Sequence, residues 1–265
     1  MTTPTEHGPG AALWRAFLGA PLWQGDFTQW LAWLENAVRT SSQPSLVVYQ
    51  NLHNLYLLHR QAAMTTCYQQ AALCYLDGYG VWLLCRMLGQ RVPKQARFSF
   101  MDCFPDVLAH AERMGWRVFY LGASPDSHAR GMEVLSTQFP DLVQSGEHGY
   151  HSNAEAVVAR INEYAPDLLF VGMGSPQQEQ WINDHLASLR ARVVLTAGGT
   201  LDYYSGTQAK PPEALSRMGL AWLYRLVTNP RRLAFRYLVE PLLLVPVVLR
   251  HAVALRRTSK QRKDR

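Results

Sequence analysis

The chain alternates short apolar runs with amphipathic stretches, and this alternation predicts an α/β fold. The apolar runs predict buried strands at residues 46–49, 73–76, 116–121, 142–143, 168–171 and 193–197. Apolar residues at helical spacing predict helices at residues 26–39, 51–64, 81–88, 104–114, 127–139, 153–164 and 177–189. Such an order is typical of parallel strands joined by right-handed crossovers. We therefore expect a Rossmann-like open, mostly parallel sheet with helices on both faces.

Residues 168–182 form the segment around which we expect the site to be organised. Gly172 and Gly174 follow an apolar run that suits a strand buried on both faces, and Pro176 suits the first turn of the next helix. Free N–H groups at such a turn favour an anionic ligand such as a diphosphate. An ordinary strand-to-helix turn is the alternative. The fingerprint Gly-x-Gly-x-x-Gly is missing, and so is an acidic residue about 20 positions on, which disfavours a nicotinamide-dependent oxidoreductase.

The character of the chain changes after residue 209, so we divide it into an α/β body, residues 1–209, and a helical appendage, residues 210–265. The appendage is expected to contain helices at residues 213–227 and from residue 229 onward, and an apolar segment at residues 237–255. The longest uncharged stretch there, Pro241 to Leu249, has nine residues, whereas a membrane span needs about 20. We expect an interfacial anchor with a polybasic end. A helix folded onto the body, followed by a solvated tail, is the alternative.

Charge is divided unevenly between these two parts. The body holds 13 Lys and Arg against 17 Asp and Glu, the appendage holds 13 against 3, and the whole chain carries +6. A basic appendage predicts an anionic partner, which can be nucleic acid, anionic lipid or a phosphorylated substrate. The four cysteines form no Cys-x-x-Cys pair and indicate buried thiols in a reducing cytoplasm. Residues 1–25 resemble no signal peptide, and we expect a frayed end there.

Candidate chemistry lies just past the predicted strands. Asp77 stands at a strand end, where a carboxylate can act as a general base, although Asp-Gly is also a common turn pair. Gly122, Gly172 and Gly198 each follow a strand, which predicts three glycine turns at one edge of the sheet. Ligands in open α/β sheets bind outside the carboxyl ends of the strands, so we expect a cleft at this edge.

Several polar side chains are expected to line this cleft. Gln178 lies in the first turn of the central helix, whereas Glu179 is expected only to complement the helix dipole. Asp202 suits either a contact with a base or ribose, or a turn cap. Arg97 and Asp102 lie in an aromatic-rich loop, where an arginine could hold a diphosphate. No Asp-x-Asp pair is present to hold a metal on a diphosphate, so we expect arginines and helix N-termini to neutralise its charge, without metal or cofactor.

The joint order of these residues resembles the WecG/TagA/CpsF glycosyltransferase family (glycosyltransferase family 26). The resemblance covers roughly residues 45–238 and is most specific from Pro166 onward. It rests on these residues, in chain order: Asn51; Asp77-Gly78-x-Gly80-Val81; Leu88-Gly89, then Arg97 and Asp102; Leu121-Gly122-Ala-Ser-Pro125; Pro166-Asp167-Leu168-Leu169-Phe170-Val171-Gly172-Met-Gly174-Ser-Pro176-x-Gln178-Glu179-x-Trp181-Ile182; Gly198-Gly199-Thr-Leu-Asp202-x-x-x-Gly206; and Gly219-Leu-x-Trp222-Leu-Tyr224-Arg225-Leu-x-x-x-Pro230-Arg231-Arg232.

The resemblance implies a bacterial, metal-independent, inverting enzyme that moves a sugar from a UDP-sugar to a polyprenyl-diphosphate-linked saccharide. It implies that Asp77 is the catalytic base and that Arg97 holds the donor diphosphate. Further substrate-binding residues would be Asn51, Asp102, Gly172, Gly174, Gln178, Gly198, Gly199 and Asp202. The residues that would meet the lipid diphosphate and the membrane are Arg225, Arg231, Arg232 and Arg236.

The expected partners are therefore a UDP-sugar, a lipid-linked acceptor and the inner face of the cytoplasmic membrane, and not nucleic acid. The sequence leaves open whether the protein forms an oligomer. The alternative is a non-catalytic scaffold with a nucleotide-binding fold, which the presence of Asp77 and Gln178 disfavours. The chain departs from the family pattern at Tyr49, at Phe100-Met101 and at Ala221. The first two departures lie near the expected donor pocket and leave the identity of the sugar open.

Overall fold

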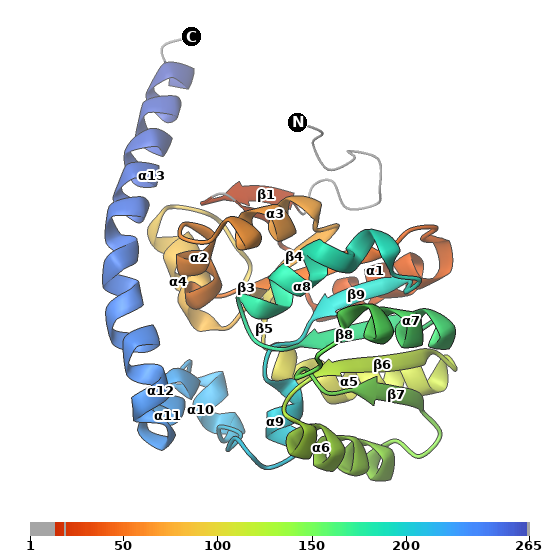
Figure 1. Ribbon diagram of the computed structural model, residues 1–265. Helices are drawn as coiled ribbons and strands as arrows, with labels where there is room; N and C mark the ends of the chain where they lie inside the picture. The colour runs from red at the N-terminus through yellow and green to blue at the C-terminus, as the bar shows by residue number, and fades with distance from the viewer. Residues whose placement is uncertain (1–13, 19, 264–265) are drawn as a thin grey trace.

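The computed structural model describes residues 14–18 and 20–263 and shows a seven-stranded parallel sheet with helices on both faces (Figure 1). The strands of this sheet are β3 (Ser45–Gln50), β4 (Leu73–Asp77), β5 (Arg97–Phe98), β6 (Arg117–Gly122), β7 (Val143–Glu147), β8 (Leu168–Gly172) and β9 (Val193–Thr196). Every predicted strand is present, although β7 is longer than the sequence indicated. The predicted α/β fold is confirmed.

The order of the strands explains where a site can form. Across the sheet the order is β5-β4-β3-β9-β8-β6-β7. The chain builds outward from β3 to β4 and β5, crosses to β6 and β7 on the other side, and then fills the middle with β8 and β9. Ligands in such sheets bind at the carboxyl ends of the strands, where a reversal of building direction leaves a crevice. The strands around this reversal end near Asn51, Asp77, Gly172 and Gly198.

Helices cover both faces of the sheet, and each face has its own apolar core. The helices of the body are α1 (Phe27–Thr40), α2 (Leu52–Leu58), α3 (Ala62–Gln70), α4 (Tyr79–Met87), α5 (Phe100–Arg113), α6 (Pro125–Gln138), α7 (Ala154–Tyr164), α8 (Gln177–His185) and α9 (Thr200–Tyr204). Alternation along β3 places Leu46 and Val48 in the core with α2, α3 and α8, and Val47 in the core with α1 and α5. Side chains that point alternately up and down account for a sheet buried on both faces.

The structure corrects four expectations about secondary structure. Residues 14–18 and 20–23 are not a frayed end, because β1 (Trp14–Phe17) and β2 (Ala20–Trp23) form an antiparallel hairpin. The two-residue strand β5 was not expected. The predicted helix 51–64 is divided into α2 and α3. The predicted helix 213–227 is divided into α10 (Glu213–Arg217) and α11 (Ala221–Thr228), because Gly219 adopts a φ of 77° between them.

The appendage continues with α12 (Pro230–Ala234), a π-helical turn, η4 (Phe235–Val239), and the long helix α13 (Glu240–Lys263), which runs along the left side of Figure 1. The start of α13 is attached to α2 of the body. Leu244 is buried in the core, and His53 Nδ1 lies 2.7 Å from Glu240 Oε2. The alternative of a helix folded onto the body is therefore confirmed for this part of α13. The polybasic side chains from residue 256 onward lie outside the described side chains.

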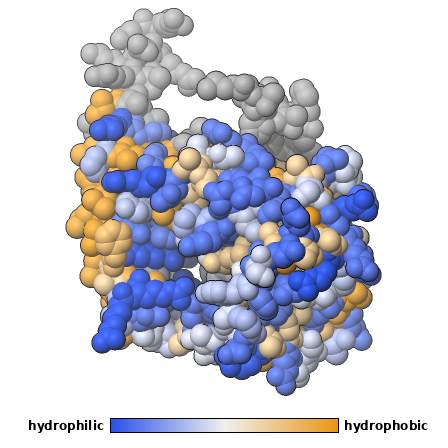
Figure 2. Space-filling view, in the orientation of Figure 1, coloured by the Kyte–Doolittle hydropathy of each residue, from blue (hydrophilic) through white to orange (hydrophobic). Residues whose placement is uncertain are grey.

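The face of α13 opposite to Leu244 is apolar and exposed. Leu242, Val245, Leu249 and Val253 are all at least about half exposed (47–68%). Their spacing places them in one stripe along the helix. In Figure 2 this stripe belongs to the hydrophobic band on the left side of the molecule. None of the described helices combines the length and the apolar character that crossing a bilayer requires.

Candidate active site

Asp77 lies at the edge of the sheet where a crevice is expected, as the last residue of β4. Gly78, with a φ of 83°, turns the chain directly into α4. The Oδ1 atom of Asp77 accepts a hydrogen bond from the Phe100 N–H (3.3 Å), and Oδ2 accepts one from Asn51 Nδ2 (3.5 Å). Burial raises the pKa of the Asp77 carboxyl above its ordinary range, and the charge of Arg225 opposes this rise. A carboxyl with a raised pKa is suited to accept a proton from a substrate hydroxyl.

The amide of Asn51 has a fixed orientation. Asn51 caps α2, because its Oδ1 accepts a hydrogen bond from the Asn54 N–H at 2.9 Å. Its amide NH₂ group therefore faces Asp77. The sequence predicts a substrate-binding role for Asn51, and that role stays a prediction. The structure shows that Asn51 orients the carboxylate of Asp77 and begins the helix that follows β3.

Three arginines from separate elements belong to this part of the structure. Arg97 lies on β5, beside β4, while the charges of Arg225 on α11 and Arg236 on η4 both act on Asp77. In each of them the buried Nε atom has no acceptor within the described structure. A buried charged N–H group without an acceptor is costly, so such a group fits an anionic ligand. Each guanidinium also lies over a tyrosine ring, at 5.3 to 5.7 Å from the centroid: Tyr79, Tyr203 and Tyr237.

Other predicted charged residues stand farther toward solvent. Arg231 and Arg232 are exposed on α12. Asp102 is exposed in the first turn of α5, two residues after Phe100, whose backbone N–H donates a hydrogen bond to Asp77. Their predicted contacts with a lipid diphosphate and with the donor stay predictions.

The three glycine turns do meet at one edge of the sheet, as the sequence predicted. A Cβ atom on Gly122 would lie 2.2 Å from the Gly172 oxygen, and one on Gly172 would lie 2.7 Å from the Gly198 oxygen. These glycines are therefore required because neighbouring backbones approach closely. Gly174 is different, since it has a φ of 80° and nothing stands within 4 Å of its missing side chain. The open space beside Gly174 lets a ligand approach the backbone closely.

Gln178 joins two of these turns. Its Oε1 accepts a hydrogen bond from the Gly198 N–H (2.9 Å), and its Nε2 donates to Ser175 Oγ (3.1 Å) and Glu179 Oε1 (2.8 Å). Gln178 is fully buried. It fixes the turn after β9 to the turn after β8, and its predicted contact with a substrate stays a prediction.

Glu179 lies in the first turn of α8, as the sequence predicted, but it does more than complement the helix dipole. Its side chain is fully buried, its Oε1 accepts hydrogen bonds from Ser175 and Gln178, and its Oε2 has no partner in the described structure. Burial raises the pKa of its carboxyl. The sequence held a signal for this burial, because Glu179 lies three positions before Ile182, on the inward face of α8.

Two further side chains shape the turn after β9. The hydroxyl of Tyr49 lies 2.8 Å from the position of a Cβ on Gly198, and burial raises its pKa to about 12, so it remains a hydrogen-bond donor at neutral pH. Asp202 Oδ2 accepts a hydrogen bond from Gln208 Nε2 (3.0 Å) and stands beside Gly199. Asp202 thus acts within its own turn, and its contact with a base or ribose stays a prediction.

The site therefore combines a carboxylate suited to act as a base with cationic groups suited to bind phosphate. Across the described residues, no three His, Cys, Asp or Glu side chains gather in a way that could hold a metal ion. The expectation that no metal takes part is untested and stays a prediction.

Comparison with known proteins decides the family. The Glycosyl transferase WecG/TagA/CpsF family matches residues 15–258 of the chain. The chain belongs to this family of glycosyltransferases. It is 29% identical over 199 residues to an N-acetylglucosaminyldiphosphoundecaprenol N-acetyl-beta-D-mannosaminyltransferase of Staphylococcus aureus (strain MRSA252), covering 75% of this chain and 74% of that relative. The same description applies to a relative from Bacillus spizizenii that is 32% identical over 176 residues, covering 66% of this chain and 67% of the relative.

Membership of the WecG/TagA/CpsF family confirms the resemblance drawn from the sequence. In this glycosyltransferase the structure brings Asp77, Asn51, Arg97, Arg225 and Arg236 together, although up to 185 positions separate them along the chain. The residues that the sequence did not single out are Tyr203 and Tyr237, and the burial of Glu179 was not predicted.

Proposed function

We propose that this chain transfers a sugar, with inversion, from a UDP-sugar to a saccharide linked to polyprenyl diphosphate. The relatives are described as N-acetylmannosaminyltransferases that act on N-acetylglucosaminyl-diphosphoundecaprenol, so we propose UDP-N-acetylmannosamine and that lipid-linked acceptor as substrates. The polymer made would belong to the bacterial envelope. The observation that carries the proposal is the Asp77 carboxyl, on which the charges of Arg225 and Arg236 act, together with buried Nε–H groups of these two arginines and of Arg97 that have no acceptor in the described structure.

The proposed reaction is a single displacement. Asp77 takes the proton of the acceptor hydroxyl while the hydroxyl oxygen attacks the anomeric carbon of the donor. The bond from that carbon to the UDP oxygen breaks, and negative charge develops on the leaving diphosphate. In this proposal Arg97, on β5 beside β4, stabilises that charge, and the N–H groups near Gly174 stabilise it further. Preorganised donors of this kind are typically worth about 2.7–4 kcal/mol each.

We propose that Arg225 and Arg236 contact the diphosphate of the acceptor. Both belong to the appendage, and the charges of both act on Asp77. Charge neutralisation by fixed guanidinium groups makes a metal on the diphosphate unnecessary in this proposal. The appendage therefore completes the site.

We further propose that the enzyme acts as a peripheral protein on the inner face of the cytoplasmic membrane. The acceptor of the relatives carries an undecaprenyl chain, and such a chain stays in the bilayer. The exposed apolar stripe of α13, followed by a basic end, supports attachment at an interface. Attachment through α13 would place the crevice near the lipid diphosphate.

A thermal-shift panel tests the donor class. The full chain would be heated with UDP, several UDP-sugars, GDP-mannose and NAD(H), each in the presence of a chelator. UDP at 100 times its Kd should add about 2.7 kcal/mol to the free energy of unfolding. Stabilisation by UDP and by UDP-N-acetylmannosamine is expected. Stabilisation by NAD(H) without any effect of UDP would overturn the proposal.

A further inference from the structure

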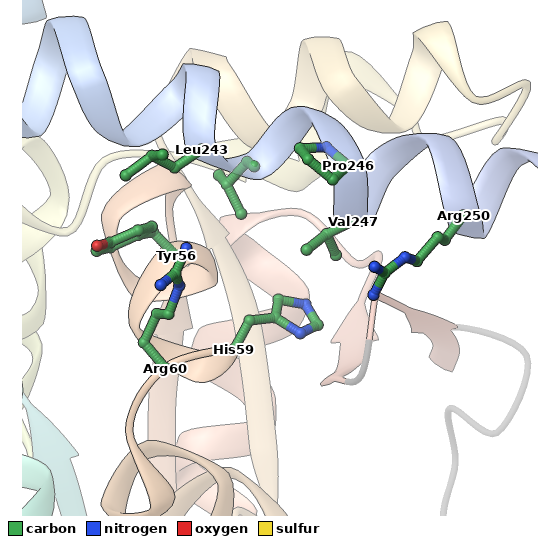
Figure 3. A pocket seen from close by; sticks show the side chains of 8 residues that line it. Tyr56, His59, Arg60, Leu243, Pro246, Val247 and Arg250 are labelled. Carbon is green, nitrogen blue, oxygen red and sulfur yellow. The ribbon is translucent and has the colours of Figure 1, made fainter.

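A cavity of about 260 Å³ lies between α2 and α13, apart from the crevice that holds Asp77 (Figure 3). Tyr56, His59 and Arg60 come from α2 and the turn after it, and they face Leu243, Val247 and Arg250 of α13. One wall is therefore apolar, and the other parts of the rim carry nitrogen-rich side chains. The cavity is a feature of the joint between the body and the appendage.

The charge of this cavity has one sign. Arg60 and Arg250 line it, and no carboxylate does. Neither guanidinium forms an ion pair with any residue that the structure describes. Arg60 instead lies over the ring of Tyr56, at 5.5 Å from the centroid. Two uncompensated guanidinium groups around one hollow complement a phosphate, to which arginine can donate paired hydrogen bonds.

The position of the cavity also points to its ligand. Two of its lining residues on α13, Leu243 and Arg250, directly follow Leu242 and Leu249 of the exposed apolar stripe, which consists of Leu242, Val245, Leu249 and Val253. Arg250 follows Leu249 directly, so the charged rim and the apolar stripe belong to the same turns of the helix. A ligand that bridges them needs an anionic group next to a hydrocarbon chain. A phospholipid at the membrane surface has this composition.

We propose that the cavity between α2 and α13 binds the headgroup phosphate of an anionic membrane phospholipid. The phosphate would lie between Arg60 and Arg250, and the upper part of an acyl chain would lie against Leu243 and Val247. This proposal rests on the attachment of α13 to the membrane that was proposed above. It adds a specific lipid site, distinct from the arginines near Asp77, that would hold α13 against the body and the membrane together.

Vesicle co-sedimentation of the full chain tests this site. The probes are vesicles of phosphatidylcholine alone and vesicles of phosphatidylcholine mixed with phosphatidylglycerol. One variant pair, Arg60→Gln with Arg250→Gln, removes both charges from the cavity. A matched control, Arg39→Gln with Arg190→Gln, removes the same charge from exposed positions of the body. A third pair, Arg60→Lys with Arg250→Lys, keeps the charge but loses the paired donors.

The unaltered chain should prefer the vesicles that contain phosphatidylglycerol. Each basic side chain near an anionic surface contributes about a five-fold effect, so the Gln pair in the cavity should weaken this binding roughly 25-fold. The control pair should weaken it far less, and the Lys pair should weaken it several-fold. Sugar transfer to a soluble acceptor analogue should be unchanged in all three, because these arginines lie outside the catalytic crevice.

The outcomes separate the site from the membrane proposal. If the control pair weakens binding as much as the cavity pair, or if the Lys pair binds like the unaltered chain, general charge explains the attraction and the cavity is not a phospholipid site. If inorganic phosphate alone abolishes the preference at physiological concentration, the cavity binds free phosphate, and the lipid assignment is wrong. If the unaltered chain binds neither kind of vesicle, the proposed membrane attachment fails as well.

Discussion

Replacing Asp77 with asparagine removes the proposed base while it changes little else in the crevice. The amide oxygen of an asparagine can still accept the hydrogen bond from the Phe100 N–H, which measures 3.3 Å in the structure. Its NH₂ group would face the NH₂ group of Asn51. The side-chain amide of Asn51 does not flip over to offer its oxygen instead, because that oxygen caps α2. Loss of such a cap costs about 1 kcal/mol. The long 3.5 Å contact to Asn51 is therefore the one that Asp77→Asn gives up.

Loss of a general base typically lowers the rate by about 10²- to 10⁴-fold, which corresponds to roughly 2.7–5.4 kcal/mol in the activation free energy. Stability should not fall in the same way. Burial raises the pKa of Asp77 in the folded protein, so the folded state binds this proton more tightly than the unfolded chain does. Stability contributed by Asp77 therefore decreases as the pH rises through the interval between the ordinary aspartate pKa and the raised value. At neutral pH the Asp77→Asn variant should unfold at the same temperature as the unaltered chain or at a higher one.

The assay is transfer of labelled N-acetylmannosamine from its UDP donor, combined with the UDP-dependent thermal shift of the same samples. A large loss in kcat with an unchanged UDP shift is expected. A kcat that stays within about ten-fold of the unaltered chain, with UDP still bound, would show that Asp77 is not the base. The Asn51→Ala variant is a useful companion, because it removes the helix cap together with the contact to Asp77.

Three other changes test neighbouring parts of the account. Arg225→Gln should move the acid limb of the kcat/KM profile to higher pH, because the charge of Arg225 opposes the rise in the pKa of Asp77, and an unmoved limb would separate the two groups. Glu179→Gln should raise Tm more at pH 8 than at pH 5, because burial raises the pKa of Glu179 and the ionised carboxylate destabilises the folded state at higher pH. An equal change in Tm at the two pH values would argue against a buried ionisable carboxyl. Leu244→Ala, at a side chain that is 3% exposed, should lower the free energy of unfolding in urea by about 2–5 kcal/mol. Leu249→Ala, at a side chain that is 60% exposed, should change it by no more than about 0.5 kcal/mol. Equal losses would contradict the packing of α13 on the body.

The sequence predicted the catalytic edge of the sheet because the relevant pattern is local. An apolar run followed by glycine or Asp-Gly marks a buried strand and its turn, and parallel strands bring all such turns to one edge. Asp77, Gly172 and Gly198 follow this rule, and the structure places them together. Arg225 and Arg236 do not follow from any local pattern, since they reach Asp77 from 148 and 159 positions away, and only the resemblance to a family indicated them.

Other features had a weak signal in the sequence or none. The hairpin of β1 and β2 turns at Leu18, which has a φ of 47°, a conformation usually marked by glycine or asparagine. The strand β5 has two residues, which is too short for a periodic pattern. Glu179 belongs to a polar run that favoured a helix start, and its hydrogen bonds from Ser175 and Gln178 appear only in the folded structure. In each case tertiary contacts determine the local structure, and the properties of single residues do not.

Tertiary contacts also determine how the apolar part of the appendage is used. The sequence of residues 237–255 suits both an interfacial anchor and a helix that packs on the body. The structure shows that α13 uses two different faces. Leu244 packs into the core, while Leu242, Val245, Leu249 and Val253 stay exposed. An apolar composition on both faces of one helix cannot be assigned to its partners until the position of the body is known.

The most direct test of the central proposal is a transfer assay with purified protein, UDP-N-acetylmannosamine and an N-acetylglucosaminyl-diphosphoprenol acceptor, with a chelator present. The product would be separated from the acceptor and its new linkage assigned by NMR. We predict a product extended by one sugar, with an inverted anomeric configuration, formed at the same rate with and without the chelator. No product from this donor or any other UDP-sugar, under conditions in which UDP binds, would contradict the account and favour a non-catalytic scaffold.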